Sequence, residues 1–182
     1  MTQIAGREEI ISFWEDAGPA KWFARDDAFD AEVRRRFLAT YEAAVAGELA
    51  GWTETAQGAL ALLILLDQFP RNMFRGDKRV YAADDIALAV AEQAIAEGFH
   101  EAIKPPLSRF FILPLTHAED IAAQDRAVAL NEAMGDAEGA KWARHHRDIV
   151  ARFGRFPHRN GILGRETTPE EADFLAESDF RG

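Results

Sequence analysis

Residues 56–70 read AQGALALLILLDQFP, and this stretch decides the fold. Apolar side chains would lie on almost every side of the helix that it forms, so we expect a central helix surrounded by other helices. Pro70 is expected to end that helix, because proline lacks the N–H that a helix interior needs. Asp67 directly follows the most apolar part and, if buried, needs a partner such as an arginine or a histidine.

Helical spacing of apolar residues continues through most of the chain. Phe29, Val33 and Phe37, for example, recur every four residues on one helix face. The alternation typical of strands is nearly absent. The sequence therefore predicts a compact all-α protein of about seven to nine helices, with residues 1–182 in a single domain. Besides the central helix, we expect helices over residues 8–14, 29–49, 78–96, 105–111, 116–134, 136–153 and 168–176.

Two segments carry the S/T-x-x-E pattern of a helix capping box. Glu119 follows Thr116, and Glu171 follows Thr168 with Pro169 between them. In a capping box the hydroxyl accepts from the glutamate amide, while the glutamate side chain reaches back to the cap. We expect both segments to begin helices.

The chain has 182 residues, no cysteine and a formal net charge of -10 at pH 7. The lack of cysteine excludes disulfides and cysteine-ligated metal sites. Net acidity argues against a nucleic-acid partner, because such binding relies on lysine and arginine at the phosphates. The longest apolar run, residues 59–66, is far below the roughly 20 residues of a transmembrane helix, and the N-terminus has no signal-peptide pattern. We therefore expect a cytoplasmic protein without a membrane partner.

Positive charge is concentrated in residues 141–165, which hold seven cations and one anion. An arginine-rich surface on an acidic protein focuses its potential on anionic ligands. Two interpretations remain open. Either the arginines bind a carboxylate or phosphate through their forked N–H groups, or they pair with the chain's own aspartates and glutamates and tie helix ends together.

Two turns share Phe-Pro followed by arginine and asparagine: QFPRN at residues 68–72 and RFPHRN at residues 155–160. The proline restricts the backbone of each turn, so the polar residues that follow are rigidly presented. We expect the two turns to form a polar pocket whose arginines Asp67 organises. The expected ligand-binding residues are Asp67, Arg71, Asn72, His117, Arg155, His158, Arg159 and Asn160.

The motifs of several enzyme classes are missing. The sequence contains no G-x-G-x-x-G, P-loop, G-x-S-x-G or H-E-x-x-H pattern. The His117-x-Glu119 pair matches part of the zinc-deaminase signature, but the P-C-x-x-C element of those enzymes needs cysteine. His145 and His146 are adjacent on an expected helix and diverge by roughly 100°, so they do not share one ion. We expect no metal and no cofactor.

The function that these patterns favour is binding of a small anionic molecule or an acidic peptide at the arginine, histidine and asparagine pocket. The alternative is an enzyme that acts on an anionic substrate at the same pocket by general acid/base catalysis, with His158 or His117 near Asp67. A convergent histidine and carboxylate in a partly dry cavity would favour the enzyme, whereas an open basic groove would favour binding. The sequence is also compatible with a homo-oligomer.

Several motifs together carry a resemblance to a known family. They are LDQFPRN at 66–72, His117-x-Glu119, HRDIV at 146–150, RFGRFPHRN at 152–160, LGR at 163–165, and the pairs at 13–14, 22–23 and 29–30. The chain resembles the bacterial family named domain of unknown function 924 over nearly its whole length. The resemblance implies a helical fold of the tetratricopeptide-like superfamily, here without a regular sequence repeat, and brings no established activity. Ala118 departs from the family pattern, in which a serine is expected.

Overall fold

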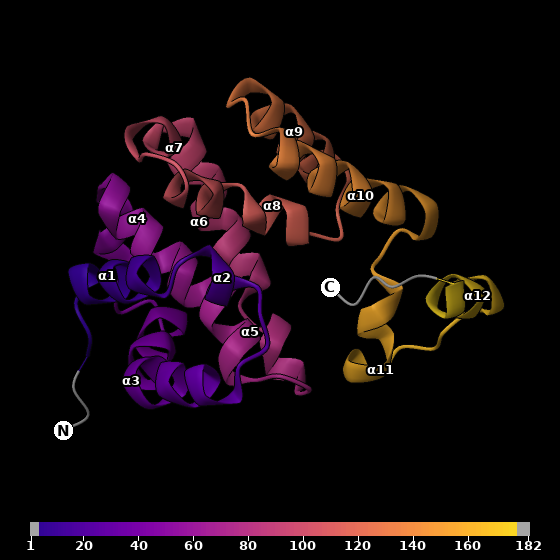
Figure 1. Cartoon of the computed structure of the whole chain (residues 1–182), viewed down its shortest axis with the longest axis horizontal. Helices are drawn as coiled ribbons and strands as arrows, with labels where there is room; N and C mark the ends of the chain where they lie inside the picture. Colours follow the sequence, from indigo (N-terminus) through magenta and orange to yellow (C-terminus); the bar gives the residue numbers. More distant parts are fainter. Residues whose placement is uncertain (1–3, 178–182) are drawn as a thin grey trace. The chain divides into compact units, whose positions relative to one another are not determined.

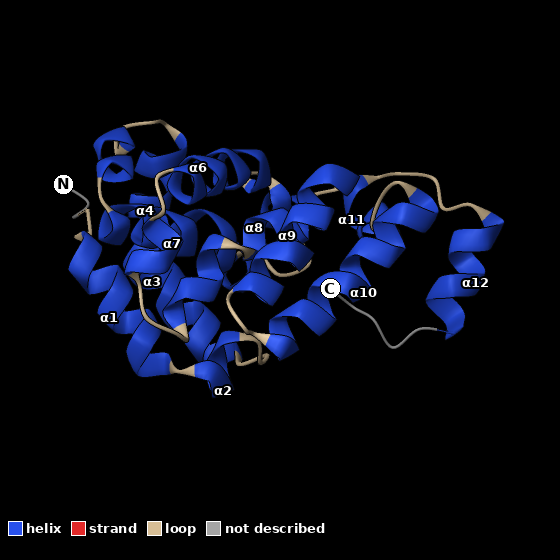
Figure 2. Ribbon diagram, turned by 90° about the horizontal axis from the view of Figure 1, so that it is seen from above, coloured by secondary structure: helices blue, strands red, loops and turns tan. Residues whose placement is uncertain are grey.

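Helices joined by turns make up the computed structural model, which describes residues 4–177 (Figures 1 and 2). No strand occurs in this part of the chain, so the predicted all-α fold is confirmed. None of the helices within residues 4–177 combines the length and the apolarity that crossing a membrane demands. The chain divides into two units, residues 4–75 with 79–114 (unit 1) and residues 76–78 with 115–177 (unit 2).

Unit 1 is built around one nearly continuous helical rod. Its α-helices are α1 (Arg7–Ala17), α2 (Pro19–Trp22), α3 (Asp27–Val45), α4 (Ala56–Leu63), α5 (Phe69–Met73), α6 (Asp84–Ala96) and α7 (Phe99–Ala102). Short 3-10 turns cover Ala50–Glu54, Leu107–Phe111 and Lys78–Tyr81, the last of which begins with a residue of unit 2. Helix α4 packs against α1, α6, α7 and two of these turns, which explains why its side chains are apolar all round.

The rod runs through Pro70, and the expectation that this proline ends the helix is wrong. Residues Ile64–Gln68 form a π-helical turn, in which the Phe69 N–H donates to the Ile64 carbonyl five residues back. Pro70 then lies in the first turn of α5, where its missing N–H costs little. Asp67 lies on this widened turn and is buried. Single π-turns of this kind are frequent at functional sites.

Aromatic rings fill the space around the rod in unit 1. Phe37 stacks on Phe69 with ring centroids 4.7 Å apart, and Trp14 meets Phe69 edge-on at 5.6 Å. Trp22 contacts Phe110 at 5.0 Å and donates its indole N–H to the Trp14 carbonyl. Offset and edge-on ring pairs of this kind add to the burial of apolar area. The tryptophans at positions 14 and 22 are therefore core residues.

Unit 2 consists of a helical hairpin followed by short helices at the C-terminal side (Figure 1). Its α-helices are α8 (Leu113–His117), whose first residues belong to unit 1, α9 (Ile121–Ala133), α10 (Ala137–Phe153), α11 (Asn160–Leu163) and α12 (Pro169–Glu177), with a 3-10 turn at Pro157–Arg159. Helices α9 and α10 pack closely through buried alanines, including Ala127 and Ala143. Gly139 lies so close to the Asn131 side chain that a Cβ atom would overlap it.

The two predicted capping boxes have different outcomes. At Thr168 the box is confirmed, because the Glu171 N–H donates to the Thr168 hydroxyl and the Thr168 N–H donates to the Glu171 carboxylate. At Thr116 it is wrong, since α9 begins at Ile121 and Asp120 accepts from the Ala123 N–H as its cap. The helix expected from residue 78 also begins later, at Asp84, after a 3-10 turn.

Candidate functional site

The first Phe-Pro turn, in unit 1, is organised by a buried carboxylate. Asp67 is 1% exposed, and its side chain binds the Arg71 guanidinium at 3.1 Å and the Gln68 amide at 2.5 Å. Arg71 also donates to the Asp67 carbonyl and to both oxygens of Asp84, at 3.2 and 3.3 Å. The prediction that buried Asp67 has an arginine partner is confirmed. The charge of Arg71 is thus shared between two carboxylates of the chain.

Asn72 has a structural partner in the same unit. Its side-chain amide donates to Asp30 at 2.8 Å. Arg75 donates to both oxygens of Asp30 and to the Ala24 carbonyl. The turn and the start of α3 are therefore connected by one carboxylate.

The second Phe-Pro turn, residues 155–160, lies in unit 2. Its first and last residues both bind the carboxylate of Glu171. Arg155 donates to Glu171 through two nitrogens, at 2.7 and 2.9 Å, and Asn160 donates to it at 3.1 Å. Glu171 is 2% exposed. The hydrogen bonds from Arg155 lower its pKa to about 2, against the effect of burial. The structure therefore brings Arg155 and Asn160 together around an internal anion.

A second carboxylate, Glu119, holds the middle of the same turn. It accepts from the Phe156 N–H at 2.7 Å and binds both terminal nitrogens of Arg165, at 2.6 and 2.9 Å. Arg165 also donates to Asn160 at 3.0 Å and to the Phe156 carbonyl at 3.1 Å. Burial favours the neutral acid, but Arg165 and the Phe156 N–H outweigh it and lower the pKa of Glu119. Glu119 and Arg165 were missed as site residues, although both lie in the quoted family motifs.

Most cations of residues 141–165 form ion pairs within unit 2. The pairs are Arg144 with Glu132, Arg147 with Asp125 and Asp148, Arg152 with Glu170, Arg155 with Glu171, and Arg165 with Glu119. For these five arginines, pairing with the chain's own acids describes the structure. Exposed pairs of this kind add little to stability, whereas those on Glu171 and Glu119 are partly or fully buried.

Arg159 has a different environment from these arginines. Its side chain lies over the Phe156 ring, 4.7 Å from the centroid, and donates to the His117 carbonyl at 2.8 Å. The residue is only 7% exposed. The rings of His146 and His158 lie 5.7 and 5.6 Å from the same Phe156 ring. We call these five residues the Arg159 cluster.

Further contacts fix the shape of the Arg159 cluster. The rings of His117 and His146 are 6.4 Å apart, and His146 Nδ1 lies 2.8 Å from the Trp142 carbonyl one helical turn earlier. The buried amide of Gln124 donates to the carbonyls of Thr116 and Ala118, at 2.7 and 2.8 Å, and so pins the residues on both sides of His117. His146 and Gln124 were not among the predicted site residues, because the long-range packing that places them has no local sequence signal.

Two histidines of this cluster, His146 and His158, are uncharged at neutral pH. Burial lowers the pKa of His146 from 6.5 to about 4, and the nearby charges of other histidines and Arg159 act in the same direction. Burial likewise lowers the pKa of His158 to about 3, assisted by Arg159. A neutral imidazole offers one N–H donor and one acceptor. The cluster therefore combines a charged guanidinium with neutral rings that can orient a ligand.

The low pKa values of His146 and His158 predict loss of stability in mild acid. The unfolded chain protonates histidine near pH 6.5, whereas the folded chain keeps these two rings neutral to about pH 4 and about pH 3. The unfolded state thus binds more protons in this window, and the free energy of unfolding should fall by up to about 1.4 kcal/mol per histidine and pH unit. Urea unfolding between about pH 6.5 and 5 measures this slope while most carboxylates stay charged.

Histidine variants identify which side chains cause this slope of the unfolding free energy against pH. His146→Asn and His158→Asn should each reduce it, whatever their effect on stability at pH 7. His145→Asn is the matched control, since His145 is an exposed neighbour on α10. Equal slopes in all four proteins would contradict neutral, partly buried rings at His146 and His158.

Within residues 4–177, no group of three or more histidines, aspartates and glutamates is positioned to hold a metal ion.

The fold and these contacts define an all-α protein with a buried guanidinium and histidine cluster on a network of internal ion pairs. The model of the family described as "Bacterial protein of unknown function (DUF924)" matches residues 10–179, and the chain belongs to this family. It is also similar to a solved structure from Agrobacterium tumefaciens, a protein of unknown function called Atu0120. The two are 53% identical, with a TM-score of 0.91 over 94% of this chain and 97% of the other. No curated protein matches the chain.

Proposed function

We propose that the protein binds an anionic group, a carboxylate or a phosphate, at the Arg159 cluster. The observation that carries this proposal is the placement of the Arg159 guanidinium, which is buried, lies over the Phe156 ring and donates to the His117 carbonyl. A guanidinium has five N–H donors in a planar fork, so one side chain can hold the His117 carbonyl and a ligand oxyanion at the same time. Stacking on an aromatic ring fixes the plane of that fork.

The other two predicted arginines have structural roles. Arg71 binds Asp67 and Asp84, and Arg155 binds Glu171 through two nitrogens. An anionic ligand would have to displace these carboxylates from partly buried positions, which costs free energy. We assign these arginines, with Asn72 and Asn160, to the frameworks that position the two turns.

The histidines favour binding over proton transfer. A general base works best when its pKa lies near the working pH. The pKa values of about 4 for His146 and about 3 for His158 make both rings weak bases at pH 7. They suit hydrogen bonding to a ligand beside the guanidinium. The alternative function, acid/base catalysis on an anionic substrate, would need another group as the base.

A thermal-shift assay with defined anions tests the proposal. Purified protein is heated with phosphate, citrate, succinate, a nucleotide or a peptide rich in aspartate and glutamate. A ligand that binds only the folded state at a hundredfold excess over its Kd should stabilise it by about 2.7 kcal/mol. The small anions and the acidic peptide are tested separately, so the assay also shows whether the ligand is a small molecule or a peptide.

Substitutions locate the binding site. Arg159→Gln should weaken the binding of any stabilising anion by about 1–3 kcal/mol, because a charge-assisted hydrogen bond is lost. Arg152→Gln is the matched control, since it removes an exposed arginine of the same segment that pairs with Glu170. Equal stabilisation of the wild type and Arg159→Gln would contradict the proposed site. Turnover of a stabilising compound would favour the alternative function, an enzyme that acts on an anionic substrate.

A further inference from the structure

The outward face of α3, in unit 1, carries residues that are spaced symmetrically in the sequence about Leu38. Ala31, Arg34, Leu38, Glu42 and Val45 lie within about 40° of one line along the helix, since each residue turns it by about 100°. Leu38 is half-buried, the other four are exposed, and Val45 is 42% exposed. The opposite face of α3 is in the core of the unit. We call these five residues the α3 stripe.

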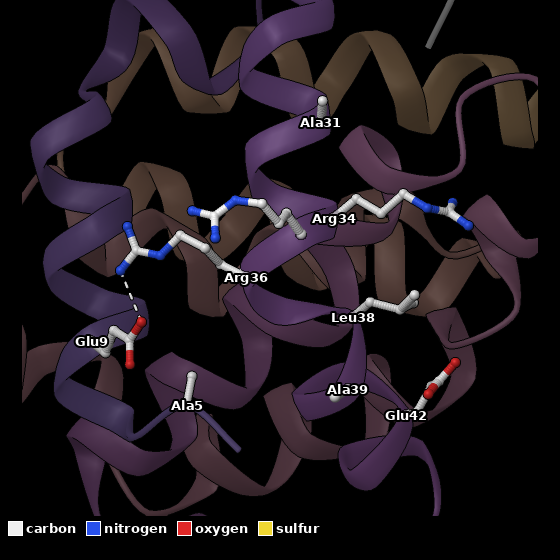
Figure 3. A pocket seen from close by; sticks show the side chains of 9 residues that line it. Ala5, Glu9, Ala31, Arg34, Arg36, Leu38, Ala39 and Glu42 are labelled. Carbon is white, nitrogen blue, oxygen red and sulfur yellow. Dashed lines mark hydrogen bonds and ion pairs between the residues drawn. The ribbon is translucent and has the colours of Figure 1, made fainter. Parts of the chain in front are cut away.

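A hollow of about 770 Å³ lies along this stripe, which contributes Ala31, Arg34, Leu38 and Glu42 to its lining. Figure 3 shows Arg34 and Arg36 extending from α3 in opposite directions, Arg36 toward Glu9 on α1. Arg36 pairs with Glu9 at 2.8 Å, and Arg34 donates to the Met73 carbonyl at 3.1 Å. These contacts direct the side chains of Arg34 and Arg36 away from each other.

The α3 stripe is complementary to itself. Arg34 and Glu42 lie four residues before and after Leu38, and Ala31 and Val45 lie seven before and after it. When two such helices pack antiparallel about a two-fold axis at Leu38, each arginine faces the glutamate of the other copy. Each exposed valine then faces the small alanine of the other copy. A two-fold interface requires this kind of match, because the same surface is used twice.

We propose that the α3 stripe is the docking site for a second copy of this chain, in an antiparallel helix pair centred on Leu38. The apolar residues exclude water at the axis, and the two arginine–glutamate pairs fix the direction and register of the helices. Each copy carries a net charge of -10, but repulsion between distant charges is screened beyond roughly 8 Å at physiological salt. This inference is independent of the anion site proposed in unit 2.

Sedimentation velocity of the full chain over a concentration series tests the proposal. As the concentration increases, the measured mass of the wild type should rise from the 20.3 kDa of one chain toward twice that value. Glu42→Arg and Arg34→Glu should each associate at least about tenfold more weakly, because like charges then face each other across the axis. Glu42→Arg leaves the bond from Arg34 to the Met73 carbonyl in place, and circular dichroism checks that both variants fold.

Recombining the substitutions tests the antiparallel register. An equimolar mixture of Glu42→Arg and Arg34→Glu should form a heterodimer, because each pair across the axis again joins opposite charges. Arg25→Glu is the charge-reversal control, since Arg25 is exposed, pairs with Asp27 and lies outside the stripe. A wild type that stays at 20.3 kDa at every concentration overturns the proposal. Single variants that associate as well as the wild type, or a mixture that stays monomeric, also overturn it.

Discussion

Arg155→Ala is expected to lower the free energy of unfolding by about 3 kcal/mol, because it leaves the carboxylate of Glu171 buried without its main counter-charge. Glu171 is 2% exposed and takes two of its hydrogen bonds from Arg155. For a chain of this length the melting temperature should fall by roughly 6–12 °C. Urea unfolding followed by circular dichroism measures the change.

The matched control for Arg155→Ala is Arg152→Ala. Arg152 lies three residues earlier, in the last turn of α10, and pairs with Glu170, but both side chains are more than half exposed. Its removal should change stability by no more than about 1 kcal/mol. Equal effects of the two substitutions would contradict a structural role for Arg155.

The effect of Arg155→Ala should also depend on pH. The pKa of Glu171 is lowered to about 2 in the folded protein, so its contribution to stability is complete above pH 4.5 and lost as the pH falls toward 2. The difference between wild type and variant should therefore narrow below pH 4.5. A difference that stays constant through that range would mean that the lost stability has another origin.

Gly58→Ala is expected to destabilise unit 1 by about 1–3 kcal/mol through overpacking. A Cβ atom at Gly58 would overlap the Trp52 carbonyl oxygen and lie 2.9 Å from the carbonyl carbon. Both are backbone atoms, so a side-chain movement cannot relieve the clash. The gain of helix propensity from glycine to alanine, up to about 1 kcal/mol, is too small to offset it.

Gly51→Ala is the control for Gly58→Ala. A Cβ atom at Gly51 meets nothing within 4 Å, so this substitution should leave the urea midpoint nearly unchanged. A Gly58→Ala variant that is as stable as the wild type would contradict the close contact between the Trp52 backbone and α4.

Local sequence patterns predicted the helices well and their interruptions poorly. The apolar run before Asp67 identified the central helix of unit 1, and the Thr168 box identified the start of α12. Pro70 did not end its helix, because the π-turn before it removes the conflict with the missing N–H. Thr116 did not cap α9, because Asp120 supplies a cap closer to the first helical residue.

The site was only partly predictable, because its partners are distant in sequence. Composition located the positive segment, and the turn motif picked out Arg155, Arg159 and Asn160. The acids that organise the turn are far away in the chain: Glu119 lies 46 residues before Arg165, and Glu171 lies 16 residues after Arg155. Such long-range pairs depend on packing and leave no periodic pattern in the sequence.

Nuclear magnetic resonance of the histidine rings tests the central claim, anion binding at the Arg159 cluster, most directly. Assigned ring signals are followed during addition of inorganic phosphate, citrate, succinate or an acidic peptide at fixed pH and ionic strength. The account predicts saturable changes at His117, His146 and His158 with at least one of these anions, little change at His100 in unit 1, and loss of the response in Arg159→Gln. Unchanged ring signals with every anion, or the same response in Arg159→Gln as in the wild type, would contradict it.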